Sequence, residues 1–166
     1  MPLKVATINV NGVRAAFKKG MAEWLAANPD IDVIALQEVR AETKDLVDLF
    51  EANPPIDAKG KPGQWHFAHD SASAKGRAGV AIVSKVAPIA ERTTLGPDEF
   101  DSAGRWLEAD FKVGSKTITV ISTYVHSGEV DTPKQVEKYK FLEAMQARMA
   151  ELIATGANVV VVGDLN

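Results

Sequence analysis

The chain of 166 residues is 46% hydrophobic and 25% charged, which is enough apolar material for the core of one globular domain. Its net charge of −3 excludes the overall basicity of many nucleic-acid-binding proteins, so such a partner would need a local basic patch or residues outside this chain. The sequence contains no cysteine, which excludes disulfides and thiolate metal sites and is typical of a reducing compartment. Any metal must therefore be bound by carboxylate, amide, hydroxyl or imidazole groups.

No apolar run reaches about eighteen residues, so we expect neither a membrane span nor a membrane partner. The first residues, Met1 to Ile8, lead directly into a strand-like pattern. They lack the basic start, the long apolar stretch and the small-residue cleavage site of a secretory leader. We therefore expect a cytoplasmic protein.

In chain order, short apolar runs rich in β-branched residues alternate with helical patterns, which predicts an α/β protein. The pattern from Trp106 to Phe111 alternates, with Glu108 and Asp110 on one side, and predicts a half-exposed antiparallel strand. The four valines from Val159 to Val162 do not alternate, which predicts a strand that is buried on both faces. The other predicted strands are Val5 to Val10, Val33 to Leu36, Val80 to Val83 and Ile118 to Tyr124.

Three helices are predicted from apolar residues at helical spacing. The first ends near Asn28-Pro29 and has its apolar face at Phe17, Met21, Trp24 and Leu25, and the second is short and contains Leu46, Val47 and Phe50. In the third, Thr132 is the expected N-cap, Pro133 the first helical residue and Gln135 the end of a capping box. The apolar stripe of this helix is Val136, Tyr139, Leu142, Met145, Met149 and Leu152, and Gly156 ends it.

Polar side chains follow three of the predicted strands at the points where the strands end. They are Asn9 and Asn11 after the first strand, Glu38 after the second, and Asp164 and Asn166 after the last. In open α/β sheets the carboxyl ends of the strands form the edge at which ligands bind. If these strands are neighbours, the side chains form one oxygen-rich pocket. Oxygen ligands without thiolates suit a hard cation such as Mg²⁺.

Each of these signals also has a purely structural reading. Asn11-Gly12 and Gly163-Asp164 are good turn dipeptides, and Glu38 could face a helix dipole as a carboxylate at a helix start. The combination of all three motifs, in this order and at strand ends, favours a site.

Six motifs, in the same order and across the whole chain, resemble those of the exodeoxyribonuclease III family of abasic-site endonucleases. The opening Ile8-Asn9-Val10-Asn11-Gly12-Val13-Arg14-Ala15 is similar to F-N-I-N-G-L-R-A and separates this family from deoxyribonuclease I, inositol phosphatase and sphingomyelinase relatives. The other matches are Leu36-Gln37-Glu38 to L-Q-E, Gly79-Val80-Ala81 to G-V-A, Gly104-Arg105 to G-R, Tyr124-Val125-His126-Ser127-Gly128 to Y-F-P-x-G, and Gly163-Asp164-Leu165-Asn166 to G-D-x-N.

The resemblance implies a four-layered α/β sandwich, two packed sheets between helices, with Mg²⁺ (or Mn²⁺) as cofactor and double-stranded DNA as partner. It implies that Glu38 is the main metal ligand, with Asn9 and Asn11 beside it binding the metal or water. The implied catalytic residues are Asp164, which orients or deprotonates the attacking water, Asn166, which holds that water or the phosphate, and Tyr124, which hydrogen-bonds the scissile phosphate. The implied reaction is in-line attack on a phosphodiester.

The chain departs from the family pattern in two ways. His126 stands where the family usually has proline, and we expect it to have a structural or phosphate-contacting role rather than to be a catalytic base. His66 and His69 are expected to be packing residues. The family's later W-N-x-x-H-type motif and its terminal S-D-H motif, whose histidine contacts the phosphate, have no counterpart here.

We therefore expect residues 1–166 to be the N-terminal portion of one domain, incomplete at the C-terminus and inactive alone. The expected function of the full-length protein is 3′→5′ exodeoxyribonuclease and abasic-site endonuclease activity in DNA repair. A C-terminal fragment of the same protein is an expected partner. The alternatives are a non-catalytic binding or interaction domain with the same fold, and a related phosphodiesterase that acts on another substrate.

Overall fold

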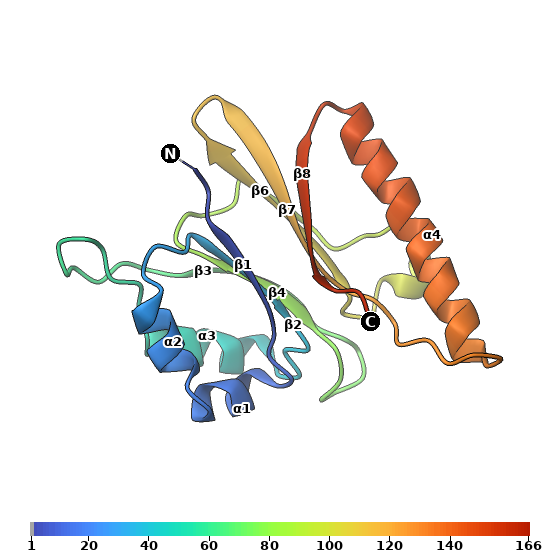
Figure 1. Ribbon diagram of the computed structural model, residues 1–166, viewed down its shortest axis with the longest axis horizontal. Coiled ribbons are helices and arrows are strands. Elements are labelled where there is room, and N and C mark those ends of the chain that lie inside the picture. The colour runs from blue at the N-terminus through green and yellow to red at the C-terminus, as the bar shows by residue number, and fades with distance from the viewer. Residues whose placement is uncertain (1) are drawn as a thin grey trace.

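The computed structural model describes residues 2–166 as an alternation of strands and helices (Figure 1). The strands are β1 (Val5–Asn9), β2 (Val33–Gln37), β3 (His66–Asp70), β4 (Val80–Ser84), β5 (Ala90–Arg92), β6 (Trp106–Val113), β7 (Lys116–Tyr124) and β8 (Asn158–Asp164). The helices are α1 (Val13–Lys18), α2 (Met21–Ala27), α3 (Thr43–Glu51), the 3₁₀ turn η1 (Asp98–Phe100) and α4 (Pro133–Ala154).

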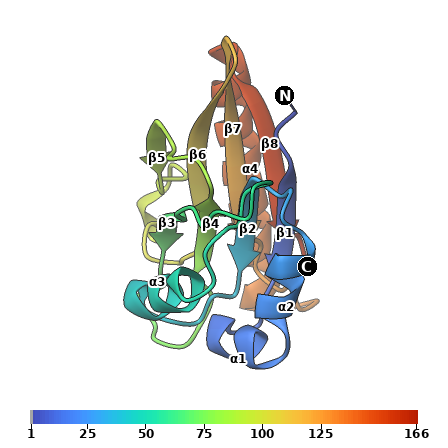
Figure 2. The ribbon, with the colours of Figure 1, turned by 90° about the vertical axis from the view of Figure 1, so that its left-hand side faces the viewer.

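The strands form two four-stranded sheets, with the orders β1-β2-β4-β3 and β5-β6-β7-β8. The sheets pack face to face, α1, α2 and α3 lie on the outer face of the first sheet, and α4 lies on the outer face of the second (Figures 1 and 2). β1 pairs in parallel with β2 and β7 with β8, whereas the other pairs are antiparallel, so both sheets are mixed. The predicted four-layered α/β sandwich is therefore confirmed.

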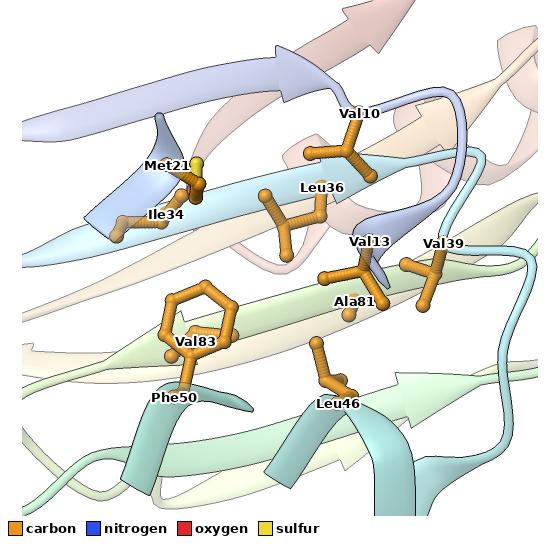
Figure 3. Close-up of a cluster of buried hydrophobic side chains, with 10 residues drawn as sticks. All are labelled: Val10, Val13, Met21, Ile34, Leu36, Val39, Leu46, Phe50, Ala81 and Val83. Atoms are coloured by element: carbon orange, nitrogen blue, oxygen red, sulfur yellow. The ribbon is translucent and has the colours of Figure 1, made fainter. Parts of the chain in front are cut away.

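Apolar side chains fill each of the three spaces between these four layers. In the outer space of the first sheet, Leu46 and Phe50 of α3 lie against Leu36 of β2 and Val83 of β4 (Figure 3). Between the sheets, β2, β3 and β4 contribute one half of a buried cluster and β6 and β7 the other half. Under α4, Phe141 and Leu152 pack with residues of the second sheet. Removal of this apolar surface from water is the main force that holds the layers together.

The first predicted helix is in fact two helices, because the chain turns at Gly20. Gly20 has a φ angle of 112°, in the left-handed region that a glycine adopts without strain, and it is the N-cap of α2. Phe17 of α1 and Trp24 of α2 still pack against the same core cluster. The apolar spacing therefore predicted the residues that pack on the core, although most of them are only partly buried. The prediction of one continuous helix was wrong.

α4 begins at Pro133 after the N-cap Thr132, as predicted, but its buried face differs from the predicted stripe. Val136, Tyr139 and Leu142 are exposed, and the buried positions are Phe141, Ala144, Met145 and Leu152. The capping box is also wrong, because the Thr132 hydroxyl donates a hydrogen bond to the Glu129 carbonyl oxygen at 2.8 Å rather than accepting one from the helix. The sheet covers a narrow part of the helix surface, which leaves the other apolar residues in solvent.

β6 is antiparallel, as predicted, but the carboxylate of Glu108 is fully buried rather than half-exposed. It accepts hydrogen bonds from Arg92 Nε at 2.5 Å, Arg148 Nε at 2.6 Å and Trp106 Nε1 at 3.0 Å. Burial alone would raise the pKa of Glu108, but these donors outweigh burial and hold the pKa below its usual range. The charged residue is tolerated because two arginines pair with it beneath α4.

The prediction that Val159 to Val162 is buried on both faces was wrong. Val159 and Val161 pack toward α4 and Val162 toward the space between the sheets, but all are only partly buried and Val160 is 39% exposed. The reason is that β8 is an edge strand, paired only with β7 among the described residues. β1 is likewise an edge strand, and the two edges lie on the same side of the sandwich (Figure 2). Across residues 2–166, no helix is long and apolar enough to span a membrane.

We expect a protein of residues 1–166 alone to self-associate through the edge of β8, since it presents unpaired backbone groups and a partly exposed valine. Val160→Lys places a charge on this edge and should shift the protein towards monomer. Size-exclusion chromatography with light scattering measures the mass. Val130→Lys, at a loop valine that is 79% exposed, is the matched control and should leave the association unchanged. A wild-type monomer at all concentrations would contradict this expectation.

Candidate functional site

The carboxyl ends of strands from both sheets bring Asn9, Glu38 and Asp164 into contact. Asn9 is the last residue of β1, Glu38 follows β2, and Asp164 is the last residue of β8. The amide nitrogen Nδ2 of Asn9 donates hydrogen bonds to Glu38 Oε1 at 2.8 Å and to Asp164 Oδ2 at 2.7 Å. One amide thus holds two carboxylates that belong to different sheets and are far apart in the sequence.

The orientation of Asn9 is set by Asn11. The backbone N–H of Asn11 donates a hydrogen bond to Asn9 Oδ1 at 3.0 Å, which turns the amide nitrogen of Asn9 towards the carboxylates. Asn11 has a φ angle of 44°, a left-handed conformation that asparagine tolerates better than most residues. In this arrangement the side chain of Asn9 is a donor that aligns the two carboxylates, and its own oxygen points back to the turn.

Glu38 is nearly buried, and its charge is stabilised from two sides. Burial alone would raise the pKa of Glu38, but the hydrogen bond from Asn9 and the positive charge of Arg40 outweigh burial and lower the pKa below its usual range. The Arg40 guanidinium forms an ion pair with Glu38 Oε2. The carboxylate is therefore ionised at neutral pH, which a cation ligand requires.

Asp164 and Asn166 form a local turn that is fixed against the end of β7. The backbone N–H of Asn166 donates to Asp164 Oδ1 at 2.9 Å, and Asn166 Nδ2 donates to the Val125 carbonyl oxygen at 2.8 Å. Gly163, with a φ angle of 149°, lies so close to β7 that a Cβ atom would collide with the Thr123 carbonyl oxygen. This close approach requires glycine directly before Asp164.

Tyr124 ends β7 at the same edge, where it interacts with both Glu38 and Arg105. Burial raises the pKa of Tyr124, and the negative charge of Glu38 raises it further, so the phenol remains protonated and able to donate a hydrogen bond. The Arg105 guanidinium carbon lies 4.6 Å from the centre of the Tyr124 ring, and Arg105 Nη1 donates to the Tyr124 carbonyl oxygen at 3.1 Å. Arg105 therefore fixes both the ring and the backbone of this residue.

Gln37, the middle residue of Leu36-Gln37-Glu38, links the two sheets behind the site. Its amide nitrogen Nε2 donates to Ser122 Oγ at 3.1 Å, and Ser122 Oγ donates in turn to the Leu36 carbonyl oxygen at 3.0 Å. Both side chains are buried. No role was predicted from the sequence for Gln37, Arg40 or Arg105. A polar residue inside an otherwise apolar strand was the available signal for Gln37.

His126 lies outside the polar cluster, in an aromatic group. The His126 ring centre is 5.9 Å from that of Phe100 and 5.1 Å from that of Phe141, and its Nδ1 is buried without a hydrogen-bond partner among the described residues. Burial lowers the pKa of His126 to about 4. The imidazole is therefore neutral at pH 7 and packs as an aromatic side chain.

The donor set of the site suits a hard cation. Glu38 and Asp164 supply carboxylate oxygens, whereas Asn9 presents its nitrogen to them and Asn11 contributes its backbone N–H to Asn9. No group of three or more His, Cys, Asp or Glu that could hold a metal occurs in residues 2–166. Mg²⁺ commonly uses one or two protein carboxylates and keeps several waters, so it does not need a larger cluster. The residues present therefore fit such an ion.

Two mixed sheets that carry carboxylates at one edge define an α/β protein with an acidic candidate site. The chain belongs to the Endonuclease/Exonuclease/phosphatase family, whose family model matches residues 6–166.

The chain is similar to several nucleases. It is 32% identical over 110 residues to the DNA repair nuclease APEX1 of Danio rerio (66% of this chain, 33% of that protein), and 27% identical over 164 residues to an exodeoxyribonuclease of Bacillus subtilis (99% and 58%). The structure of an AP endonuclease from Archaeoglobus fulgidus superimposes with a TM-score of 0.78 at 27% identity and covers 99% of this chain and 57% of that one. The chain thus spans between a third and somewhat over half of the length of these proteins.

Acidification should remove a stabilising contribution of His126. The His126 imidazole takes up a proton at its ordinary pKa of 6.5 in the unfolded chain, but at a pKa of about 4 in the folded protein. Its contribution to the free energy of unfolding is therefore complete above pH 6.5 and is lost as the pH falls towards 4. We expect His126→Phe, which keeps an aromatic ring beside Phe100 and Phe141, to gain stability relative to wild type by about 1–3 kcal/mol between pH 7 and pH 4.5. Urea unfolding at both pH values measures the difference.

Asp70 is a control with the opposite sign. Burial raises the pKa of Asp70 to about 6, and the charge of Asp101 adds to this effect. The stability associated with protonated Asp70 is complete below its ordinary pKa of 3.8 and is lost as the pH rises through 6. Asp70→Asn should therefore gain stability relative to wild type at pH 7 rather than at pH 4.5. If the free energies of unfolding of wild type and His126→Phe changed in parallel with pH, the lowered pKa assigned to His126 would be contradicted.

Proposed function

We propose that the complete protein hydrolyses DNA phosphodiesters with Mg²⁺ or Mn²⁺, as a 3′→5′ exodeoxyribonuclease and abasic-site endonuclease in DNA repair. The observation that carries the proposal is the contact of Asn9 with both Glu38 and Asp164, which joins two ionisable carboxylates at one edge of the sandwich. Support also comes from the family membership and from the relatives named as DNA repair nuclease, exodeoxyribonuclease and AP endonuclease.

In this proposal Glu38 is the main metal ligand, with Asn9 and Asn11 beside it. The cation supplies charge neutralisation at the phosphate oxygens when it is bound. Because the Asn9 nitrogen faces both carboxylates, we assign to Asn9 the alignment of Glu38 relative to Asp164. This alignment keeps the ligand and the water-activating group at a fixed separation, and positioning of this kind accounts for much of enzymatic rate enhancement.

The other three residues act on water and phosphate. Asp164 accepts the proton of the attacking water or orients it, and Asn166 holds that water or the phosphate. Tyr124 donates its phenolic proton in a hydrogen bond to a phosphate oxygen, which its raised pKa supports. Donors aimed at the oxygens where charge develops stabilise the transition state.

We further propose that residues 1–166 are the N-terminal portion of a single domain. A C-terminal segment of the same protein would pack along the edges of β1 and β8. The partial exposure of Val160 on β8 and the position of both edges on one side of the sandwich support this arrangement (Figure 2). The fragment alone is then expected to be inactive.

Glu38→Ala should abolish binding of Mn²⁺ at this site, since it removes the one carboxylate that Asn9 and Arg40 hold in the ionised form. Electron paramagnetic resonance of free Mn²⁺ measures the binding. Glu51→Ala, which removes an exposed carboxylate at the end of α3, is the matched control and should bind as wild type does. Equal affinity of Glu38→Ala and wild type would refute the metal assignment.

Asp164→Asn in the full-length protein should reduce nicking of an abasic-site duplex by about 10² to 10⁴-fold, since it removes the group that positions or deprotonates the nucleophile. The affinity for the duplex should change far less, because the amide keeps the size of the carboxylate. Single-turnover cleavage and fluorescence anisotropy separate the two quantities. Asp48→Asn, on the exposed face of α3, should retain full activity. Near-normal turnover of Asp164→Asn would show that the catalytic carboxylate lies elsewhere.

A further inference from the structure

Both oxygens of the Glu38 carboxylate are engaged, one by Asn9 and the other by Arg40. Asn9 Nδ2 donates to Oε1 at 2.8 Å, and the Arg40 guanidinium pairs with Oε2. The two interactions differ in kind, since the first is a hydrogen bond from a neutral amide and the second brings a full positive charge to the carboxylate. A divalent cation held by Glu38 would meet this positive charge beside the same carboxylate.

The backbone that carries this ion pair is fixed on both sides. Glu38 and Arg40 each have a φ angle of 51°, and Val39 between them is fully buried in the core. The backbone N–H of Val39 donates to the Gly79 carbonyl oxygen and that of Arg40 to the Ala78 carbonyl oxygen, both at 3.0 Å. The Arg40 side chain, by contrast, is 43% exposed. The pair can therefore open by rotation of the Arg40 side chain alone.

A cavity directly beside the pair offers Arg40 a second position. The cavity has a volume of about 280 Å³, and Arg40 forms part of its wall together with Lys75 and Arg77. Glu42 and Asp45 also line it, so a guanidinium that leaves Glu38 meets carboxylates there rather than only other cations. Asp45 pairs with Arg14 at 3.1 Å and Glu42 lies 4.0 Å from Lys75, so the Arg40 guanidinium would share these carboxylates with cations already present in the wall.

We propose that Arg40 is an exchangeable counter-ion of Glu38. Its guanidinium neutralises the carboxylate in the absence of a divalent cation, and it moves to the adjacent cavity when the cation binds. Arg40 is then a positioning residue that lowers the metal affinity of the site and keeps Glu38 ionised and in place while the metal is absent. The inference rests on the metal-dependent function proposed above and assigns a regulator to that site.

Removal of Arg40 should tighten metal binding in the complete protein. Arg40→Gln is expected to bind Mn²⁺ about two- to fivefold more tightly than wild type, the size of effect that a partly exposed ion pair produces, and Arg40→Lys should lie between the two. Lys44→Gln removes one positive charge from the exposed face of α3, outside the cavity wall and without contact to Glu38, so it should bind Mn²⁺ as wild type does. Electron paramagnetic resonance measures the affinities, and thermal unfolding verifies that each variant is folded.

A spectroscopic measurement follows the movement itself. In a ¹⁵N–¹H NMR spectrum, the side-chain Nε resonance of Arg40, identified by its loss in Arg40→Gln, should shift on titration with Mg²⁺ and saturate with the metal. The Nε resonance of Arg92, which pairs with Glu108 in the second sheet away from this cavity, should shift little.

The outcomes separate this inference from the function on which it rests. Absence of Mn²⁺ binding in wild type would overturn the proposed metal site as well. Binding in wild type, with equal or weaker affinity in Arg40→Gln or with a stationary Arg40 resonance, would overturn the exchange alone.

Discussion

The contact of one amide with two carboxylates is the constraint on which the candidate site depends. Asn9 can reach both Glu38 and Asp164 only if β1 and β8, on different sheets, end at the same height. The packing of the two sheets fixes that height through apolar contacts that have no direction of their own. The buried hydrogen bond from Gln37 to Ser122 fixes the position of one sheet relative to the other, because a sliding movement between the sheets would leave these two polar groups unpaired.

The same contact sets the electrostatics of the site. Two carboxylates that share one donor carry like charges, which repel each other. The Arg40 guanidinium offsets it on the side of Glu38, and the backbone N–H of Asn166 offsets it at Asp164. In the proposed function a cation held by Glu38 would add to this compensation, so the ion pair with Arg40 bears on the proposed metal affinity.

Buried charge also organises the second sheet, where the sequence pattern was misleading. Alternation along β6 indicated a solvent-exposed face for Glu108, yet that face lies beneath α4 and two arginines. Loss of one of these partners would leave an uncompensated charge in the core, which is far more costly than the loss of a surface ion pair. On α4 the buried Phe141 and the Arg148 that pairs with Glu108 face the sheet, whereas Val136 and Leu142 of the predicted stripe are exposed.

The sequence by itself determined the α/β class, six of the eight strands in the described residues and the placement of polar residues at strand ends, because apolar periodicity and motif order are local properties of the chain. From these, Asn9, Glu38 and Asp164 could be named and expected to meet. Only the tertiary structure decided which way the Asn9 amide faces, that Arg40 pairs with Glu38, and that β8 is a partly exposed edge. Each of these depends on neighbours far away in the sequence, and no local pattern encodes the position of a strand in a sheet or the partner of a long charged side chain.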